Sequence, residues 1–117
     1  MRGSRVRERQ VSEETKKRAE AEVRQQRRAF LQAVEEITTG LGETEKRSKA
    51  TIERTVTILG IAEARAVKSE VDAIEAAGGM PTVDGSRRRT PGGIYLFLIK
   101  QRLNAAGRKD LIKQIVG

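Results

Sequence analysis

The residues best suited to chemistry lie in one short segment, Gly85-Ser-Arg-Arg-Arg-Thr-Pro-Gly-Gly93. Its three consecutive arginines carry planar guanidinium groups, which donate paired hydrogen bonds to phosphate oxygens. Thr90 and Pro91 form a helix start signal, because threonine caps a helix N-terminus and proline fits the first helical position. Gly92 and Gly93 then fall in the first turn, where backbone N–H groups lack intrahelical acceptors and attract anions. The segment therefore predicts a site for phosphate groups.

The candidate site extends beyond the glycines to an aromatic and a basic side chain. Tyr95 is expected at the edge of a basic groove, where its ring would stack on a nucleic-acid base. The full set of candidate RNA-binding residues is Arg87, Arg88, Arg89, Thr90, Gly92, Gly93, Tyr95 and Lys100. A structural alternative stays open: the glycines permit close helix packing, the arginines are solvated or form a localisation signal, and Tyr95 belongs to the core.

The composition argues against catalysis. The chain has no cysteine and no histidine, so disulfides, zinc sites of the usual kind, thiol nucleophiles and the commonest general base are excluded. Carboxylates are present at Asp72, Asp84 and Asp110, but their spacing suggests neither a metal cage nor an acid and base pair. We expect no enzyme activity, no catalytic or metal-binding residue and no cofactor.

The net charge of +8 is concentrated at the two ends of the chain. Residues 1–10 contribute +3, residues 11–42 contribute 0, residues 43–84 contribute −2 and residues 85–117 contribute +7. A basic C-terminal third is typical of a protein that binds a polyanion, because lysines and arginines that neutralise phosphates release condensed counterions. The alternative is a solvated basic face without a partner.

The elements that position the candidate site are expected to be helices. Only three residues are aromatic, so the core must consist of small aliphatic side chains, which favours helices packed on helices. We predict an all-α fold, a small bundle of about five helices with a long N-terminal helix. Apolar spacing and glycine or proline punctuation place these helices near residues 12–39, 43–59, 61–77, 90–103 and 108–116.

Three regions follow from this organisation: a disordered basic arm over residues 1–11, the long helix over 12–42 and a helical domain over 43–117. The first half of the long helix is nearly all charged, so only its second half is expected to pack. The apolar run Ile94–Ile99 also fits a buried strand, but the start signal at Thr90 favours a helix.

The chain shows no feature of export or membrane insertion. Its first ten residues carry four arginines without an apolar stretch behind them, and no apolar run approaches the roughly 18 residues that span a bilayer. We expect a soluble, intracellular protein without membrane contact, in the nucleus or the cytoplasm.

The stretch Gly78-Gly-Met-Pro-Thr-Val-Asp-Gly-Ser-Arg-Arg-Arg-Thr-Pro-Gly-Gly-Ile-Tyr-Leu-Phe-Leu-Ile-Lys100 closely resembles the signature of a known domain. This is the RNA-binding domain of the phosphorylated adapters for RNA export, which link capped small nuclear RNAs to the nuclear export machinery. The upstream segment Ile52 to Ala77 looks similar to the same family, and the resemblance covers roughly Ser48 to Val116. Its motif is specific, because a double glycine precedes the arginines and an apolar helix follows them.

The resemblance implies a helical domain that binds single-stranded RNA with little sequence preference. It carries over to Arg87–Arg89, Thr90, Gly92, Gly93 and Tyr95, which match the motif. The export role is not implied, because the acidic, phosphorylated and export-signal regions of the full-length adapters lie outside the matching domain and this chain is too short to contain them.

Two further readings compete with RNA binding. In the first, the long N-terminal helix would pair with a helical protein partner or with itself, and the basic loop would have no RNA role. The apolar patch over residues 23–41 spans too few heptads to identify a coiled coil. Duplex DNA binding is disfavoured, because a recognition helix needs polar side chains to reach base edges, whereas Ile94–Ile99 is apolar.

Overall fold

The computed structural model describes residues 2–117, with side chains from Ser12 onward, and within that range it contains five helices and no strand. The helices are α1 (Arg2–Gly40), α2 (Lys46–Leu59), α3 (Ile61–Ala76), α4 (Pro91–Ala105) and α5 (Lys109–Val116). The expected all-α fold with a long first helix is confirmed. The chain divides into two units, residues 1–31 and 32–117.

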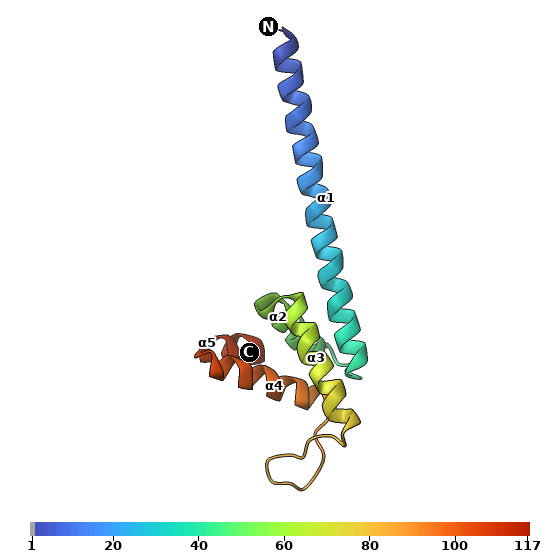
Figure 1. The fold of residues 1–117 in the computed structure, drawn as a ribbon, viewed down its shortest axis with the longest axis vertical. Helices are drawn as coiled ribbons and strands as arrows, with labels where there is room; N and C mark the ends of the chain where they lie inside the picture. Colours follow the sequence, from blue (N-terminus) through green and yellow to red (C-terminus); the bar gives the residue numbers. More distant parts are fainter. Residues whose placement is uncertain (1) are drawn as a thin grey trace. The chain divides into compact units, whose positions relative to one another are not determined.

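Residues 32–117 hold the core of the protein. Helix α3 contacts α2 and α4, and α5 contacts both α2 and α4, so that these four helices close into a ring (Figure 1). Its large fully buried side chains are aliphatic apart from Thr55, as the composition predicted, and the last turns of α1 contribute to them. The largest are Val34, Ile37, Val67, Val71, Ile94, Ile99 and Ile115.

Helix α5 closes the ring through both its apolar face and its backbone. Ile115 is fully buried, and its carbonyl oxygen accepts a hydrogen bond from Nε of Arg54 on α2 at 2.8 Å. The contact joins residues 61 positions apart in the chain. The C-terminal helix is therefore part of the core and not an appendage.

The end of α1 determines where α2 begins. Gly42 has φ +72°, its N–H donates to Thr39 O at 3.0 Å, and the N–H of Glu43 donates to Thr38 O at 3.0 Å. This pair of hydrogen bonds is a Schellman motif, which ends a helix with a glycine in the left-handed region. Because the backbone of Glu43 is engaged in closing α1, the expected start of α2 at this residue is wrong, and the helix begins at Lys46.

Helix α4 is the element that carries the second half of the candidate site. The side chain of Thr90 accepts a hydrogen bond from the N–H of Gly93, and Pro91 occupies the first helical position, as predicted. Ile94, Ile99 and Leu103 are buried along the helix. The helical interpretation of the run 94–99 is confirmed over the strand.

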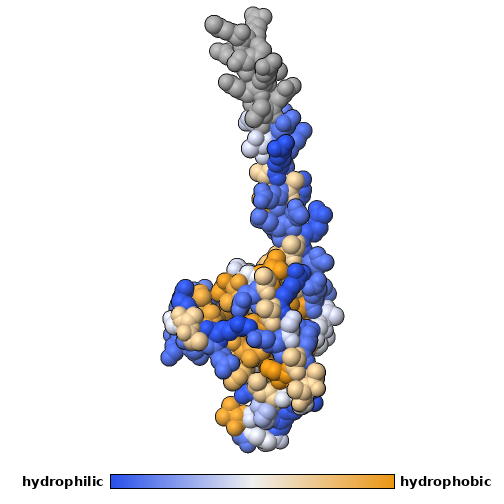
Figure 2. Space-filling model, in the orientation of Figure 1, coloured by the Kyte–Doolittle hydropathy of each residue, from blue (hydrophilic) through white to orange (hydrophobic). Residues whose placement is uncertain are grey.

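In residues 1–31, α1 is described from Arg2, before the expected start at Ser12. Met1 and the side chains of residues 1–11 lie outside the described part, so the basic N-terminal arm stays a prediction. From Ser12 to Arg28 every side chain is exposed, and Figure 2 shows a largely hydrophilic surface there. No helix in the described residues has an apolar stretch that could cross a bilayer.

Candidate nucleic-acid interface

The connection between α3 and α4 is an ordered hairpin, here called the arginine hairpin (residues 80–89). The N–H of Thr82 donates to Arg87 O at 2.8 Å, and the N–H of Arg89 donates to Met80 O at 2.7 Å. These hydrogen bonds frame an antiparallel bridge between Pro81 and Arg88. Sequence analysis missed this bridge, because a single pair of hydrogen bonds leaves no alternating apolar pattern.

The tip of the hairpin is a turn at Asp84-Gly85. The N–H of Gly85 donates to Thr82 O at 2.9 Å, and Gly85 has φ +71°. The Asp84 carboxylate accepts hydrogen bonds from the Thr82 hydroxyl at 2.7 Å, the Ser86 hydroxyl at 2.8 Å and the Ser86 N–H at 3.1 Å. These donors lower the pKa of Asp84 from 3.8 to about 2.

Acidification is therefore expected to loosen the hairpin tip at an unusually low pH. A depressed carboxyl pKa means that the turn is stabilised above pH 3.8, and that this contribution is lost as the pH falls through about 2. The backbone amide resonance of Ser86, followed by NMR, should titrate with a midpoint near the lower value, and Asp84→Asn should abolish the titration. A midpoint near 3.8 would mean that the carboxylate does not hold the turn.

The three arginines of the hairpin have different surroundings. Arg87 is exposed, and its guanidinium has no partner among the described residues. Arg88 forms an ion pair with the Glu75 carboxylate on α3 and also approaches the Glu75 carbonyl at 3.5 Å. Arg89 donates from Nε to Pro81 O at 3.0 Å. Arg87 is thus free to bind an anion, while Arg88 and Arg89 are oriented by the protein.

Arg89 also lies over an aromatic ring that sequence analysis did not select. Its Cζ is 4.8 Å from the centroid of Phe97, a side chain that is 37% exposed. Phe97 follows Gly93 by four residues and precedes Lys100, also exposed, by three, so the three share one face of α4. That spacing was visible in the sequence and could have identified Phe97.

Tyr95 is a core residue, and the prediction that it stacks on a base is wrong. It is 3% exposed, and its hydroxyl donates to Ala64 O on α3 at 3.0 Å. Burial raises the pKa of this hydroxyl. Tyr95 shares the inward face of α4 with Ile99, whereas Phe97, two residues on, points outward.

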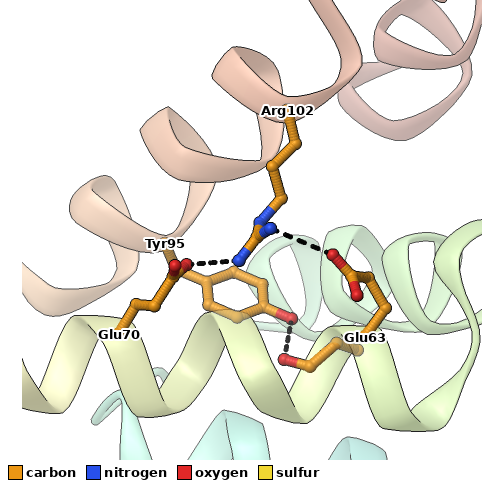
Figure 3. A network of polar contacts seen from close by, with 5 residues as sticks. Glu63, Glu70, Tyr95 and Arg102 are labelled. Atoms are coloured by element: carbon orange, nitrogen blue, oxygen red, sulfur yellow. Dashed lines mark hydrogen bonds and ion pairs between the residues drawn. The ribbon is translucent and has the colours of Figure 1, made fainter. Parts of the chain in front are cut away.

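Figure 3 shows Tyr95 beside an ion-pair cluster that joins α3 to α4. Arg102 contacts Glu63 at 3.1 Å and Glu70 at 2.6 Å, and all three side chains are partly exposed. This cluster fixes the seam between the two helices. It leaves the charge of Arg102 neutralised, so the free positive charge of the domain lies elsewhere.

The first turn of α4 offers less to an anion than its sequence predicted. The N–H of Gly93 donates to the Thr90 hydroxyl at 3.1 Å, and the N–H of Ile94 donates to Thr90 O at 3.0 Å. Pro91 has no N–H, so Gly92 keeps the one amide of this turn without an acceptor among the described residues. A phosphate would find one free backbone donor here, and the arginines remain the main source of anion binding.

The two glycines lie close to side-chain oxygen atoms. A Cβ at Gly92 would lie 1.8 Å from Oε1 of Glu43, and a Cβ at Gly93 would lie 3.2 Å from the Thr90 hydroxyl. The neighbour of Gly92 is the flexible end of the Glu43 side chain and not another helix, so the packing alternative stays a prediction. Sequence analysis missed Glu43, because nothing local connects it to a residue 49 positions later.

Comparison with known proteins agrees with the family resemblance seen in the sequence. Residues 33–116 match the family described as "Phosphorylated adapter RNA export protein, RNA-binding domain". Proteins named phosphorylated adapter RNA export protein are similar to this chain. The one from Rattus norvegicus is 48% identical over 52 residues, 44% of this chain and 14% of that protein. The one from Gallus gallus is 40% identical over 67 residues, 57% of this chain and 16% of that protein.

The Homo sapiens protein of the same name is 44% identical over 52 residues, 44% of this chain and 13% of that protein. The chain thus matches only 13–16% of the length of these relatives. No solved structure matches it. The names describe an adapter and its RNA-binding domain and not an enzyme, in agreement with the sequence. With most of its residues covered by this match, the chain belongs to the family of phosphorylated adapter RNA export protein RNA-binding domains.

Proposed function

We propose that this domain binds single-stranded RNA with little sequence specificity, through the arginine hairpin and the exposed face of α4. The observation that carries the proposal is the group formed by a free Arg87, the stacked pair of Arg89 and Phe97, and an exposed Lys100. The family description supports RNA as the polyanion.

The group combines the two contacts that single-strand binding requires. Arg87 and Lys100 supply charge to phosphates, which positions a strand without reading its sequence. The exposed Phe97 ring, braced by Arg89, supplies a stacking surface, and base stacking tolerates any sequence because every base has a π-face.

Single strands are favoured over duplexes for a geometric reason. A ring can stack only on a base that is already unpaired, and specific RNA recognition accordingly targets single-stranded segments. Phe97 would contribute nothing to binding an intact duplex. In the context of the relatives' name, the domain would serve as the RNA-holding module of a small-RNA transport adapter.

A helical interaction module is the second candidate. Val23 and Leu31 on α1 are large apolar side chains that are 63% and 51% exposed. Their exposure favours a helical protein partner or self-association through the N-terminal helix, with no RNA role for the hairpin. Under this reading, loss of hairpin charge would leave RNA affinity unchanged.

Arg87→Ala is expected to weaken single-stranded RNA binding by about 1–2 kcal/mol, a factor of roughly 5–30, because a charge-assisted contact to phosphate is lost. The slope of log K against log salt should also fall in magnitude by about 0.7, the value for one phosphate on a single strand. Fluorescence anisotropy with single- and double-stranded RNA and DNA of equal length, at several salt concentrations, measures both.

Arg47→Ala is the matched control for this experiment, since Arg47 is an exposed arginine on α2 whose guanidinium has no partner in the described part of the chain. It removes the same charge away from the hairpin. Equal losses in the two variants would indicate a general charge effect, and no loss in Arg87→Ala would favour the interaction module.

A further inference from the structure

A cavity of about 230 Å³ opens between the start of α4 and the segment that joins α1 to α2. It is here called the Glu43 pocket, and its walls include Glu43, Ser48, Thr51, Ile52, Gly92 and Leu96. The volume is below the roughly 300–1,000 Å³ of sites for drug-sized ligands, so it suits a single small ring system. Its lining is mixed, with aliphatic walls around a few polar groups.

The polar groups of the pocket are unequally occupied. The Thr51 hydroxyl donates to Arg47 O at 3.0 Å, and the Thr55 hydroxyl donates to Thr51 O at 2.9 Å. The carboxylate of Glu43 and the hydroxyl of Ser48 have no hydrogen-bond or ion-pair partner among the residues described. Two side-chain groups that can accept hydrogen bonds, and the N–H of Gly92, therefore remain available in the lining.

The backbone of Glu43 is held in place although its carboxylate is unpaired. Its backbone N–H is fixed by Thr38 O, and Gly92 lacks the side chain that would otherwise displace Oε1. Most other carboxylates in residues 32–117 form an ion pair with a lysine or an arginine, as Glu75 does with Arg88. A partially enclosed carboxylate repels phosphate and needs a ligand that presents N–H donors.

From these observations we propose that the Glu43 pocket binds one guanine base. The inference rests on the proposed function and refines it at a single nucleotide. A carboxylate accepts two parallel hydrogen bonds from adjacent donors, and guanine presents two such donors, N1–H and the N2 amino group, on one edge. Adenine and cytosine place an acceptor nitrogen beside their amino group, and uracil flanks its N3–H with two carbonyl oxygens.

The pocket also lies beside the proposed RNA track. Gly93 lines it and shares a helix face with Phe97, and the Cβ of Arg89 is 3.9 Å from the position of a Cβ on Gly93. An RNA strand held at Arg89 and Phe97 can therefore turn one base into the pocket, while the neighbouring bases make no base-specific contact. The remaining contacts stay tolerant of sequence.

The test compares uridine oligonucleotides that carry a single central G, A or C, by fluorescence anisotropy with the full chain. The parent should bind the G oligonucleotide at least about fivefold more tightly than the A oligonucleotide, since a bidentate contact discriminates by that much or more. Glu43→Gln is isosteric and should abolish the preference. Glu45→Gln, two residues away and exposed, removes the same charge and should keep it.

A parent that binds all three oligonucleotides equally, or a G preference that survives Glu43→Gln, overturns the proposal. Guanosine monophosphate, titrated while the amide resonances of Ser48 and Gly92 are followed by NMR, separates the remaining cases. Shifts that Glu43→Gln abolishes support the pocket and show that it also accepts a free nucleotide. A G preference without such shifts also supports the proposal. It would show that the pocket binds guanine within an RNA strand and does not bind the free nucleotide.

The same titration distinguishes the two proposals if no oligonucleotide binds. Nucleotide shifts at Ser48 and Gly92 would then leave the pocket standing and remove the RNA function. Absence of both oligonucleotide binding and shifts would remove both.

Discussion

Tyr95→Ala is expected to destabilise the domain by about 3–5 kcal/mol, because it empties a large aromatic site in the core. Tyr95 is 3% exposed and packs α4 against α3. The loss is a large fraction of the roughly 5–15 kcal/mol that stabilises a domain of ordinary size. Urea unfolding followed by circular dichroism measures it as a fall in the midpoint at constant slope.

Tyr95→Phe separates the contribution of ring packing from that of the hydroxyl hydrogen bond at the same position. It keeps the ring and removes the hydrogen bond to Ala64 O, so a cost of about 1 kcal/mol is expected. Its RNA affinity should equal that of the parent. A tenfold loss of RNA affinity in a Tyr95→Phe domain of near-normal stability would contradict the assignment of Tyr95 to the core.

Gly79→Ala is expected to cost about 1–3 kcal/mol and to weaken RNA binding. Gly79 has φ +89°, where a Cβ costs about 1–2 kcal/mol. The new Cβ would also lie 2.1 Å from Nε of Arg88, forcing that side chain away from Glu75. Because Arg88 anchors the base of the arginine hairpin, its release should disorder the neighbouring residues of the hairpin, including the proposed RNA contact Arg87.

Gly78→Ala is the control that isolates backbone strain. Gly78 also has a positive φ, +116°, but a Cβ there meets nothing within 4 Å. Both variants should lose stability in thermal unfolding, and only Gly79→Ala should lose RNA affinity and the hairpin amide pattern in NMR spectra. Equal RNA affinities in the two variants would mean that Arg88 does not support the site.

The helices and several of their ends were predictable because their signals are local, although the starts of α1 and α2 were not. Thr90 and Pro91 start α4 as expected, and the glycines at 78–79 end α3 through backbone hydrogen bonds that any chain with this punctuation can form. The turn at Asp84-Gly85 was equally accessible, since Asp, Gly and Ser carry their turn preference with them.

The errors at the site have a common origin in contacts between distant residues. Whether Tyr95 or Phe97 faces the core depends on the orientation of α4 against α3, and an apolar run hides that orientation. The approach of Glu43 to Gly92 and the ion pair of Arg88 with Glu75 join separate elements in the same way. The sequence identified the segment that carries the candidate site but not which of its side chains are free.

The closure of the helical ring by α5 has a consequence for synthesis. Until Ile115 and its carbonyl reach Arg54, α2 and α4 keep part of their apolar surface uncovered. This contact spans most of the domain, and the loop it closes must be ordered before burial offsets the entropy. On the ribosome, the domain therefore cannot complete its core until α5 has left the exit tunnel, although the arginine hairpin emerges earlier. A nascent chain would expose the basic arginine hairpin before the domain has a stable fold. RNA that binds at that time would bind a partly folded protein.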